Sequence, residues 1–302
     1  MKIRMNRLCN IDGRIKPEND ATIPVLDRGF LFGDSVCEVV RTHRGRLLQL
    51  DAHIARLKAS AARVLIDVPI TDEKLQQRIE ETVELAGNDE TYVRLIVTRG
   101  VSSAPVIDPD YTLSAPSVIV IVRPMLERPQ TVMSCGSSAW LVDVRRNHPD
   151  ALDPAIKSGN YLNNILALNE ARKHNADVAL LLNSAGCLTE AATANVFLVQ
   201  EGKLRTPSLA AGIVAGITRR VVAQRAQAEG YTVEEADLTA EDARSADEIF
   251  LTCTTQSIAP ITRLDGELVG SGRPGLVTLR IAERYEAWCD ELVGWAGAPA
   301  LN

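Results

Sequence analysis

Lys157 stands in surroundings that suit a reactive amine. It lies in the run DPAIKSGNYL (residues 153–162), after an apolar stretch bounded by Pro154 and before an Asn-Tyr pair that opens a helical pattern. Lysine is scarce in this chain, which takes most of its positive charge from arginine. A lysine amine shielded beside a helix can lose its proton readily and then act as a Schiff-base nucleophile or as a base. We therefore take Lys157 as the candidate catalytic residue.

Two stretches could hold an anion. Gly212 to Thr218 is a glycine-bearing loop that runs into a predicted helix, where backbone N–H groups attract negative charge and the Thr218 hydroxyl adds a donor. The run TCTTQS at 252–257 places hydroxyls at the end of an apolar strand, where they could bind phosphate or carboxylate oxygens. Each stretch also fits an ordinary turn or polar loop, and the residues alone leave both interpretations open.

Glu190 and Arg56 are the other charged candidates. Glu190 is surrounded by small and apolar residues, and a buried carboxylate needs a partner such as a protonated ring nitrogen. Arg56 occurs in the pattern His53-x-x-Arg56-Leu57 on a predicted helix, and arginine binds phosphate through two parallel hydrogen bonds. Taken singly, Glu190 also fits a solvated turn and Arg56 a solvated helix face.

Composition restricts the class of protein. The chain has 302 residues, 46% of them hydrophobic and 24% charged, which is typical of about two globular domains. A net charge of -6 and an aromatic content of 4% argue against nucleic-acid partners and anionic membranes. No apolar run is long enough to span a bilayer, and the N-terminus lacks the apolar core of a signal peptide.

The cysteines and histidines show no metal pattern. The six cysteines are far apart with no C-x-x-C pair, and the four histidines lack metal-ligand spacing. We therefore predict no metal site, reduced thiols and a cytoplasmic location.

The predicted elements mix helices and strands without strict alternation, which favours an α+β class with two domains. We expect an N-terminal α+β domain over 1–123, a linker over 124–135 and a C-terminal domain over 136–302. A helix is predicted from Asp51, which could cap it, to Ile66. The other predicted helices are 160–174, one opened by the stretch 210–219 and running to about 229, and 275–288. The predicted strands are 92–98, 118–122, 178–182, 195–199, 203–206 and 248–253.

Six motifs occur in an order that resembles the fold type IV pyridoxal-phosphate enzymes. That family includes branched-chain and D-amino-acid aminotransferases, (R)-selective amine transaminases and aminodeoxychorismate lyases. The motifs cover nearly the whole chain and are Asp27-Arg28-Gly29-x-x-Phe32-Gly33-Asp34, His53-x-x-Arg56-Leu57, Lys157-x-Gly159-Asn160-Tyr161, Thr189-Glu190-x-x-x-x-Asn195-x-Phe197, Gly216-Ile217-Thr218-Arg219 and Thr254-Thr255-x-x-Ile258-x-Pro260-Ile261.

The resemblance implies the cofactor pyridoxal 5′-phosphate and a role for each matching residue. Lys157 would attach the cofactor covalently and then move the substrate's proton. Glu190 would pair with the pyridinium nitrogen, which makes the ring an electron sink, and Tyr161 would bind the phenolic oxygen. The phosphate would be held by Arg56, Ile217, Thr218 and Thr254. The full predicted cofactor-binding set is Arg56, Lys157, Tyr161, Glu190, Asn195, Gly216, Ile217, Thr218 and Thr254.

The resemblance also implies an aminotransferase that moves an amino group between an amino acid and a 2-oxo acid, and family members are usually homodimers. The Gly-Asn-Tyr stretch and Arg94 are similar to the matching residues of the branched-chain enzymes. This similarity implies branched-chain or related aliphatic amino acids as donors and 2-oxoglutarate as acceptor. Glu38-Val39-Val40 and Cys253-Thr254-Thr255 are more similar to the D-amino-acid enzymes, although their Arg-x-His carboxylate trap is missing after Gly100. An (R)-amine transaminase and an aminodeoxychorismate lyase are further alternatives. The candidate substrate-binding residues are Phe32, Arg28, Arg94, Arg41 and Thr255.

Overall fold

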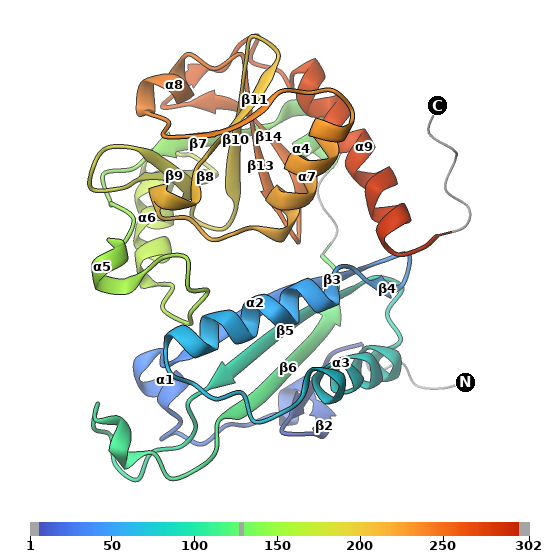
Figure 1. Ribbon diagram of the computed structural model, residues 1–302, viewed down its shortest axis with the longest axis vertical. Helices are drawn as coiled ribbons and strands as arrows, with labels where there is room; N and C mark the ends of the chain where they lie inside the picture. Colours follow the sequence, from blue (N-terminus) through green and yellow to red (C-terminus); the bar gives the residue numbers. More distant parts are fainter. Residues whose placement is uncertain (1–5, 127–129, 296–302) are drawn as a thin grey trace. The chain divides into compact units, whose positions relative to one another are not determined.

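The computed structural model describes residues 6–126 and 130–295 and divides into two compact units (Figure 1). The first unit comprises Met1–Leu126, Ile156–Asn160 and Asp290–Asn302, and the second comprises Glu127–Ala155 and Tyr161–Cys289. The sequence predicts continuous domains, whereas each unit is built from separate stretches of chain. The difference matters for function because Lys157 belongs to the first unit, while the predicted boundaries place it in the C-terminal domain. Part of the predicted linker, 127–129, lies outside the described residues.

The first unit is built on an antiparallel sheet of order β2-β1-β6-β5-β3-β4. Apolar side chains alternate along its central strands, so that one face packs against two helices and forms the core. The elements are β1 (Leu8–Ile11), β2 (Arg14–Pro17), α1 (Arg28–Phe32), β3 (Ser35–His43), β4 (Arg46–Leu47), α2 (Leu50–Arg63), α3 (Asp72–Ala86), β5 (Thr91–Thr98) and β6 (Ser117–Pro124). The helices that cover the core face are α2 and α3 (Figure 1).

The second unit contains a nine-stranded mixed sheet, of order β12-β11-β10-β13-β14-β7-β8-β9 with β15 beside β14. Helix α6 packs on β7 and β8, and α7 packs on β12 and β13. The elements are α4 (Gln130–Cys135), β7 (Ser137–Leu141), α5 (Pro149–Leu152), α6 (Leu162–Lys173), β8 (Val178–Leu182), β9 (Leu188–Ala191), β10 (Asn195–Gln200), β11 (Lys203–Pro207), α7 (Ile217–Ala228), β12 (Val233–Ala236), α8 (Ala240–Arg244), β13 (Glu248–Cys253), β14 (Ser257–Leu264), β15 (Glu267–Leu268) and α9 (Leu276–Leu292).

The α+β class and the ten predicted elements are confirmed, with ends that differ by a few residues. The predicted cap of the first long helix is wrong. Helix α2 begins at Leu50 with Gln49 as its N-cap residue, which makes no side-chain capping bond. Asp51 lies inside the first turn, where its charge still favours the positive end of the helix dipole.

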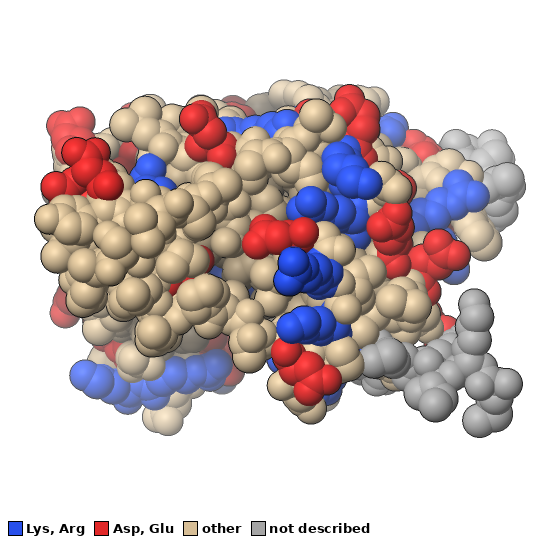
Figure 2. All heavy atoms as spheres, turned by 90° about the horizontal axis from the view of Figure 1, so that it is seen from below, with Lys and Arg blue, Asp and Glu red and all other residues tan. Residues whose placement is uncertain are grey.

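The surface carries charges of both signs. On the face drawn in Figure 2, Lys and Arg side chains lie next to Asp and Glu side chains, and a broad neighbouring area carries few of either. Within residues 6–126 and 130–295, the helices are too short or too polar to cross a membrane. The same residues contain no group of three or more His, Cys, Asp or Glu side chains arranged to hold a metal ion.

Candidate active site

The backbone of Lys157 is clamped between a strand and a helix of the first unit. Its N–H donates to Ser60 Oγ on α2 at 3.2 Å, and its carbonyl accepts from the N–H of Cys37 on β3 at 2.9 Å. Ser158 forms an isolated antiparallel bridge with Val36. The segment 156–160 therefore adds to the edge of β3 like a short extra strand, and the half-buried Lys157 side chain projects from an ordered backbone.

Gly159, the glycine of the Lys157-x-Gly159 motif, is required by close packing. Its N–H donates to the carbonyl of Ser35 at 2.8 Å. A Cβ atom at this position would lie 2.2 Å from Ser35 Oγ, so another residue would displace the Ser35 hydroxyl or the segment itself. The glycine thus sets the position of the lysine two residues earlier.

Arg56 belongs to a buried cluster with Glu38 and His53. The Glu38 carboxylate accepts from Arg56 Nε at 2.6 Å and Nη2 at 2.8 Å, and it lies 2.8 Å from His53 Nδ1. Burial alone raises the pKa of Glu38, but the hydrogen bonds from Arg56 and His53 outweigh it and lower the pKa to about 2. Burial lowers the pKa of His53, and the nearby charges of Arg56 and Lys157 lower it further against the raising effect of Glu38. The carboxylate is therefore ionised and the imidazole neutral at pH 7.

In the second unit, Glu190 on β9 is buried and has several donors. Arg146 donates to its Oε1 from Nε at 3.1 Å and Nη2 at 3.0 Å. Asn195 Nδ2 and the Val214 N–H donate to Oε2 at 3.1 Å and 3.0 Å. Sequence reasoning predicts a partner for a buried Glu190 but misses Arg146, which lies 44 residues earlier in the chain. The alternative of a solvated turn is excluded because Glu190 is only 4% exposed.

The predicted anion loop leads into α7 as expected. Gly216 is the N-cap residue, without a side-chain capping bond, and Ile217 and Thr218 are buried in the first turn. A Cβ atom on Gly216 would lie 1.8 Å from Asn195 Oδ1, so only glycine allows Asn195 to pack here. The same asparagine donates to Glu190 and to the Val214 carbonyl. Asn195 therefore joins the buried carboxylate to the start of the helix.

The hydroxyl-bearing run 252–257 begins with the last two residues of β13 and continues through the turn to the first residue of β14. Asn195 is directly opposite Thr252 in the sheet, so their side chains share a face. The Thr252 hydroxyl is buried and has no hydrogen-bond partner among the described residues. Thr254 and Thr255 follow in the turn between β13 and β14 and are half-buried. An unsatisfied buried hydroxyl beside a helix N-terminus is the kind of group that a bound anion would satisfy.

Arg28 has a structural task instead of the predicted substrate contact. It is 3% exposed, its Nε donates to Asp34 at 3.0 Å, and its other nitrogens donate to the carbonyls of Val106, Ile107 and Asp108. Its guanidinium also lies 5.1 Å from the ring centre of Phe32. Arg28 thus anchors the loop 101–113 and leaves almost no donor for a substrate carboxylate.

The remaining predicted residues lie in different places. Arg41 and Arg94 lie on the face of the first unit's sheet opposite its core, on neighbouring strands β3 and β5, and both are half-buried. Tyr161 is the N-cap residue of α6 in the second unit. The structure therefore places Lys157, Arg56, Arg41 and Arg94 in the first unit, and Tyr161, Glu190, Asn195, Gly216, Ile217, Thr218, Thr254 and Thr255 in the second.

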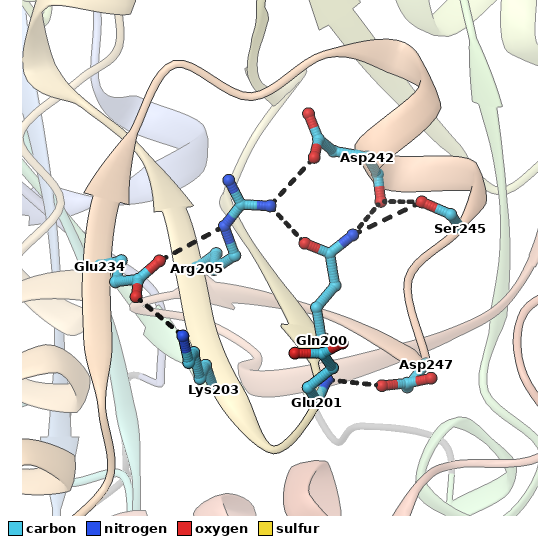
Figure 3. A pocket seen from close by; sticks show the side chains of 8 residues that line it. All are labelled: Gln200, Glu201, Lys203, Arg205, Glu234, Asp242, Ser245 and Asp247. Carbon is cyan, nitrogen blue, oxygen red and sulfur yellow. Dashed lines mark hydrogen bonds and ion pairs between the residues drawn. The ribbon is translucent and has the colours of Figure 1, made fainter.

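A separate polar hollow of about 470 Å³ lies in the second unit (Figure 3). Both of its basic side chains are paired with acidic ones. Arg205 lies between Glu234, at 3.6 Å, and Asp242, at 2.9 Å, and Lys203 also reaches Glu234. None of the residues that line it is among the predicted site residues. We therefore do not take this hollow as the active site.

The comparisons with known proteins agree on one family. The model of the amino-transferase class IV family matches residues 35–264. A Methanocaldococcus jannaschii protein, provisionally named a branched-chain-amino-acid aminotransferase, is 37% identical over 95% of this chain and 96% of its own length. A D-alanine aminotransferase from Listeria innocua is 36% identical over the same shares of the two chains.

Two solved structures have the same fold. A branched-chain aminotransferase from Thermoproteus uzoniensis, solved with norvaline, has a TM-score of 0.85 and 32% identity over 96% of each chain. A branched-chain amino acid aminotransferase from Thermobaculum terrenum, solved in its pyridoxal-phosphate form, has a TM-score of 0.84 and 26% identity over 95% of this chain and 94% of its own. The two-unit α+β architecture, the clamped lysine and these matches lead to one conclusion: the chain belongs to the class IV aminotransferases.

Proposed function

We propose that this protein is a pyridoxal-phosphate-dependent aminotransferase that acts on branched-chain or related aliphatic amino acids, with 2-oxoglutarate as acceptor. The observation that carries the proposal is the clamped Lys157 beside the Glu38–His53–Arg56 cluster, in a chain of the class IV family. Relatives of both branched-chain and D-alanine type match at similar identity. A D-amino-acid transaminase is therefore the second candidate.

The chemistry of the donor groups fits a phosphorylated pyridine. The buried Glu190 carboxylate suits a cationic ring nitrogen, and Arg56 and the N-terminus of α7 suit a phosphate. The buried Thr252 hydroxyl has no hydrogen-bond partner among the described residues and suits a polar atom of such a ligand. Lys157 supplies an amine on an ordered backbone, as attachment to an aldehyde requires.

Bound pyridoxal phosphate supplies an aldehyde that receives the amino group and a ring that takes up electrons. The protein supplies proton transfer and fixed charges. We propose that Lys157 Nζ takes the proton from the substrate Cα and returns it elsewhere on the same molecule. Glu190 holds a proton on the ring nitrogen, and Arg146 offsets the negative charge of this buried carboxylate while it does so. Arg56 in the first unit, and Thr218 and Thr254 in the second, would hold the phosphate, and Tyr161 would hold the phenolic oxygen.

The face of the first unit's sheet opposite its core suggests how two kinds of substrate are accepted. In the register of β3 and β5, Val39 is opposite Arg94 and Arg41 is opposite Tyr92, while Cys37 is opposite Ile96. These side chains therefore share one face, on which cations lie beside apolar groups. We propose that Val39 and Ile96 contact an aliphatic side chain. Arg94 and Arg41 would then bind the second carboxylate of 2-oxoglutarate, in place of the Arg28 contact that the structure disfavours.

Titration of the cofactor-loaded protein with L-leucine, and separately with D-alanine, tests the proposal. We expect L-leucine to reduce the visible absorption band of the bound cofactor, and 2-oxoglutarate to restore it. A response to D-alanine alone would move the protein to the D-amino-acid class. A loaded protein that responds to neither would contradict both, and release of pyruvate from aminodeoxychorismate would then be measured.

We also propose that the protein is a cytoplasmic homodimer. All six cysteines lie in the described part of the chain and none is in a disulfide, which fits a reducing compartment. In the first unit, large apolar side chains are exposed on and near the loop that Arg28 anchors. They are Val25 (70% exposed), Phe30 (65%), Ile107 (79%) and Leu113 (73%). Ordered apolar groups of this kind are typical of a subunit interface.

Ile107→Glu is expected to dissociate the homodimer. A charge in the apolar centre of an interface raises the dissociation constant by about 30-fold or more, since a central contact contributes roughly 2 kcal/mol or more. Sedimentation across a concentration series would measure this. Leu85→Glu is the matched control, because Leu85 is also an exposed apolar side chain (56%) but lies on α3. Dissociation by the control and not by Ile107→Glu would place the interface elsewhere.

A further inference from the structure

We propose that Glu38 is a positioning residue that holds the Arg56 guanidinium in the orientation in which it binds the cofactor's phosphate. The inference rests on the proposed function, because it concerns the affinity for a phosphorylated cofactor. It adds a buried carboxylate to the proposed phosphate site, for which the sequence motifs indicate only hydrogen-bond donors to the phosphate.

The position of Glu38 is unusual for a charged residue. On β3 it alternates with Val36 and Val40, which belong to the core between the sheet and the two helices. Its exposed fraction is 0%. Burying a carboxylate is strongly unfavourable unless it is paired, and a well-packed apolar residue would stabilise such a position at least as well. Core packing therefore gives no reason for a carboxylate here, whereas orienting a cation does.

The hydrogen bonds orient the guanidinium closely. The Glu38 carboxylate accepts hydrogen bonds from Arg56 Nε at 2.6 Å and from Arg56 Nη2 at 2.8 Å. These two nitrogens form one edge of the planar guanidinium. This side-on pairing directs the opposite edge, with Nη1, away from the carboxylate. Arginine side chains lose considerable rotational freedom when they bind a ligand. A guanidinium held beforehand loses less, so the phosphate is bound more tightly.

His53 holds the carboxylate in turn. Its Nδ1 lies 2.8 Å from Glu38 Oε2, and the ring is 2% exposed. His53 and Arg56 lie three residues apart on α2, so one helix face presents both groups to β3. Because His53 is neutral, Glu38 and Arg56 balance each other's charge. The cluster can thus stay buried near Lys157 without adding a net positive charge beside that amine.

The test compares pyridoxal phosphate with pyridoxal, which lacks the phosphate, by equilibrium dialysis against the full-length chain freed of cofactor. Hydrogen bonds to charged groups contribute about 1.5–3 kcal/mol. We therefore expect Glu38→Gln to raise the dissociation constant for pyridoxal phosphate by about 10- to 100-fold. The constant for pyridoxal should change by less than about threefold. Glu18→Gln is the control, because it removes another glutamate–arginine pair of the first unit, with Arg123, and should change neither constant.

The outcomes separate the inference from the proposed function. A wild-type protein that binds pyridoxal phosphate no better than pyridoxal would contradict the phosphate site itself. A wild-type preference that Glu38→Gln leaves intact would overturn the positioning role alone. So would an equal loss of affinity for both ligands in a Glu38→Gln variant that keeps its fold, because the effect would then not act through the phosphate.

Two further variants serve if Glu38→Gln does not fold. Arg56→Lys keeps the positive charge but loses the side-on pair, and it should weaken pyridoxal phosphate binding by about tenfold without affecting pyridoxal. Wild-type affinity in Arg56→Lys would overturn the proposal. The double variant Arg56→Gln/Glu38→Gln removes both charges and should bind pyridoxal phosphate as Arg56→Gln does, since Glu38 acts only through Arg56. Weaker binding of pyridoxal phosphate by the double variant than by Arg56→Gln would contradict a role of Glu38 that acts only through Arg56.

Discussion

Lys157→Ala is expected to abolish transamination, with a fall in rate of at least about 10,000-fold. The variant loses both the attachment point for the cofactor's aldehyde and the group proposed to move the Cα proton, and a positioned base alone contributes about 100- to 10,000-fold. The measurement is the amino-group transfer from L-leucine, or from D-alanine, to 2-oxoglutarate. Some binding of pyridoxal phosphate should remain, because Arg56, Glu190 and the start of α7 are unchanged.

The fold should survive this substitution. The hydrogen bonds that clamp the segment to Ser60 and Cys37 are made by the backbone of Lys157, and the bond to Ser35 at the segment's end is made by the backbone of Gly159. Lys157→Arg is the sharper variant, because it keeps a positive charge but provides no nucleophilic amine at neutral pH. Lys173→Ala, at the exposed end of α6, controls for loss of a lysine elsewhere. Near-normal turnover in Lys157→Ala would overturn its catalytic role.

The secondary structure that the sequence predicts well is the part with local signals. Strands β8 and β13 are short apolar runs between polar turns, and α7 follows a glycine-bearing loop. These patterns depend on neighbouring residues only. The candidate residues Lys157, Glu190 and Arg56 also occur in short motifs, so they could be named without the fold.

Two of the strands that the sequence does not predict have broken patterns. Strand β3 carries the buried Glu38 among its apolar residues, and a charge at a core position hides the alternation. Strand β14 contains Pro260, which normally argues against a strand inside a sheet. In β3 the tertiary contacts make the strand acceptable, since Arg56 and His53 pair with the carboxylate from another element.

The partners of the charged residues also depend on the fold. Arg146 has no motif that marks it, yet it is the cation of Glu190. Arg28 lies in a motif that suggests a substrate contact, but the loop carbonyls that it binds are about 80 residues away in the sequence. A signal for Arg146 exists only in retrospect, because a buried glutamate among small residues requires some cation.

The second large effect is expected for Glu190→Ala, which should reduce both activity and stability. The activity should fall by about 100- to 1,000-fold, because the ring loses the carboxylate proposed to keep its nitrogen protonated. From the sequence alone, the fold would be expected to tolerate the change. The structure alters that expectation, since Arg146 is 8% exposed and would keep a buried, uncompensated charge. Removing one partner of such a pair destabilises a protein by roughly 3–5 kcal/mol, which chemical denaturation would measure.

A double variant, Glu190→Ala/Arg146→Leu, separates the two effects. Leucine removes the uncompensated charge and fills part of the space of the arginine, so most of the lost free energy of unfolding should return. The activity should stay low, because no carboxylate faces the ring nitrogen. If stability and activity returned together, the loss in Glu190→Ala would come from the buried charge of Arg146, and Glu190 would have no role at the ring. If stability returns but activity does not, the reaction requires the Glu190 carboxylate itself, since the fold around position 190 is then intact.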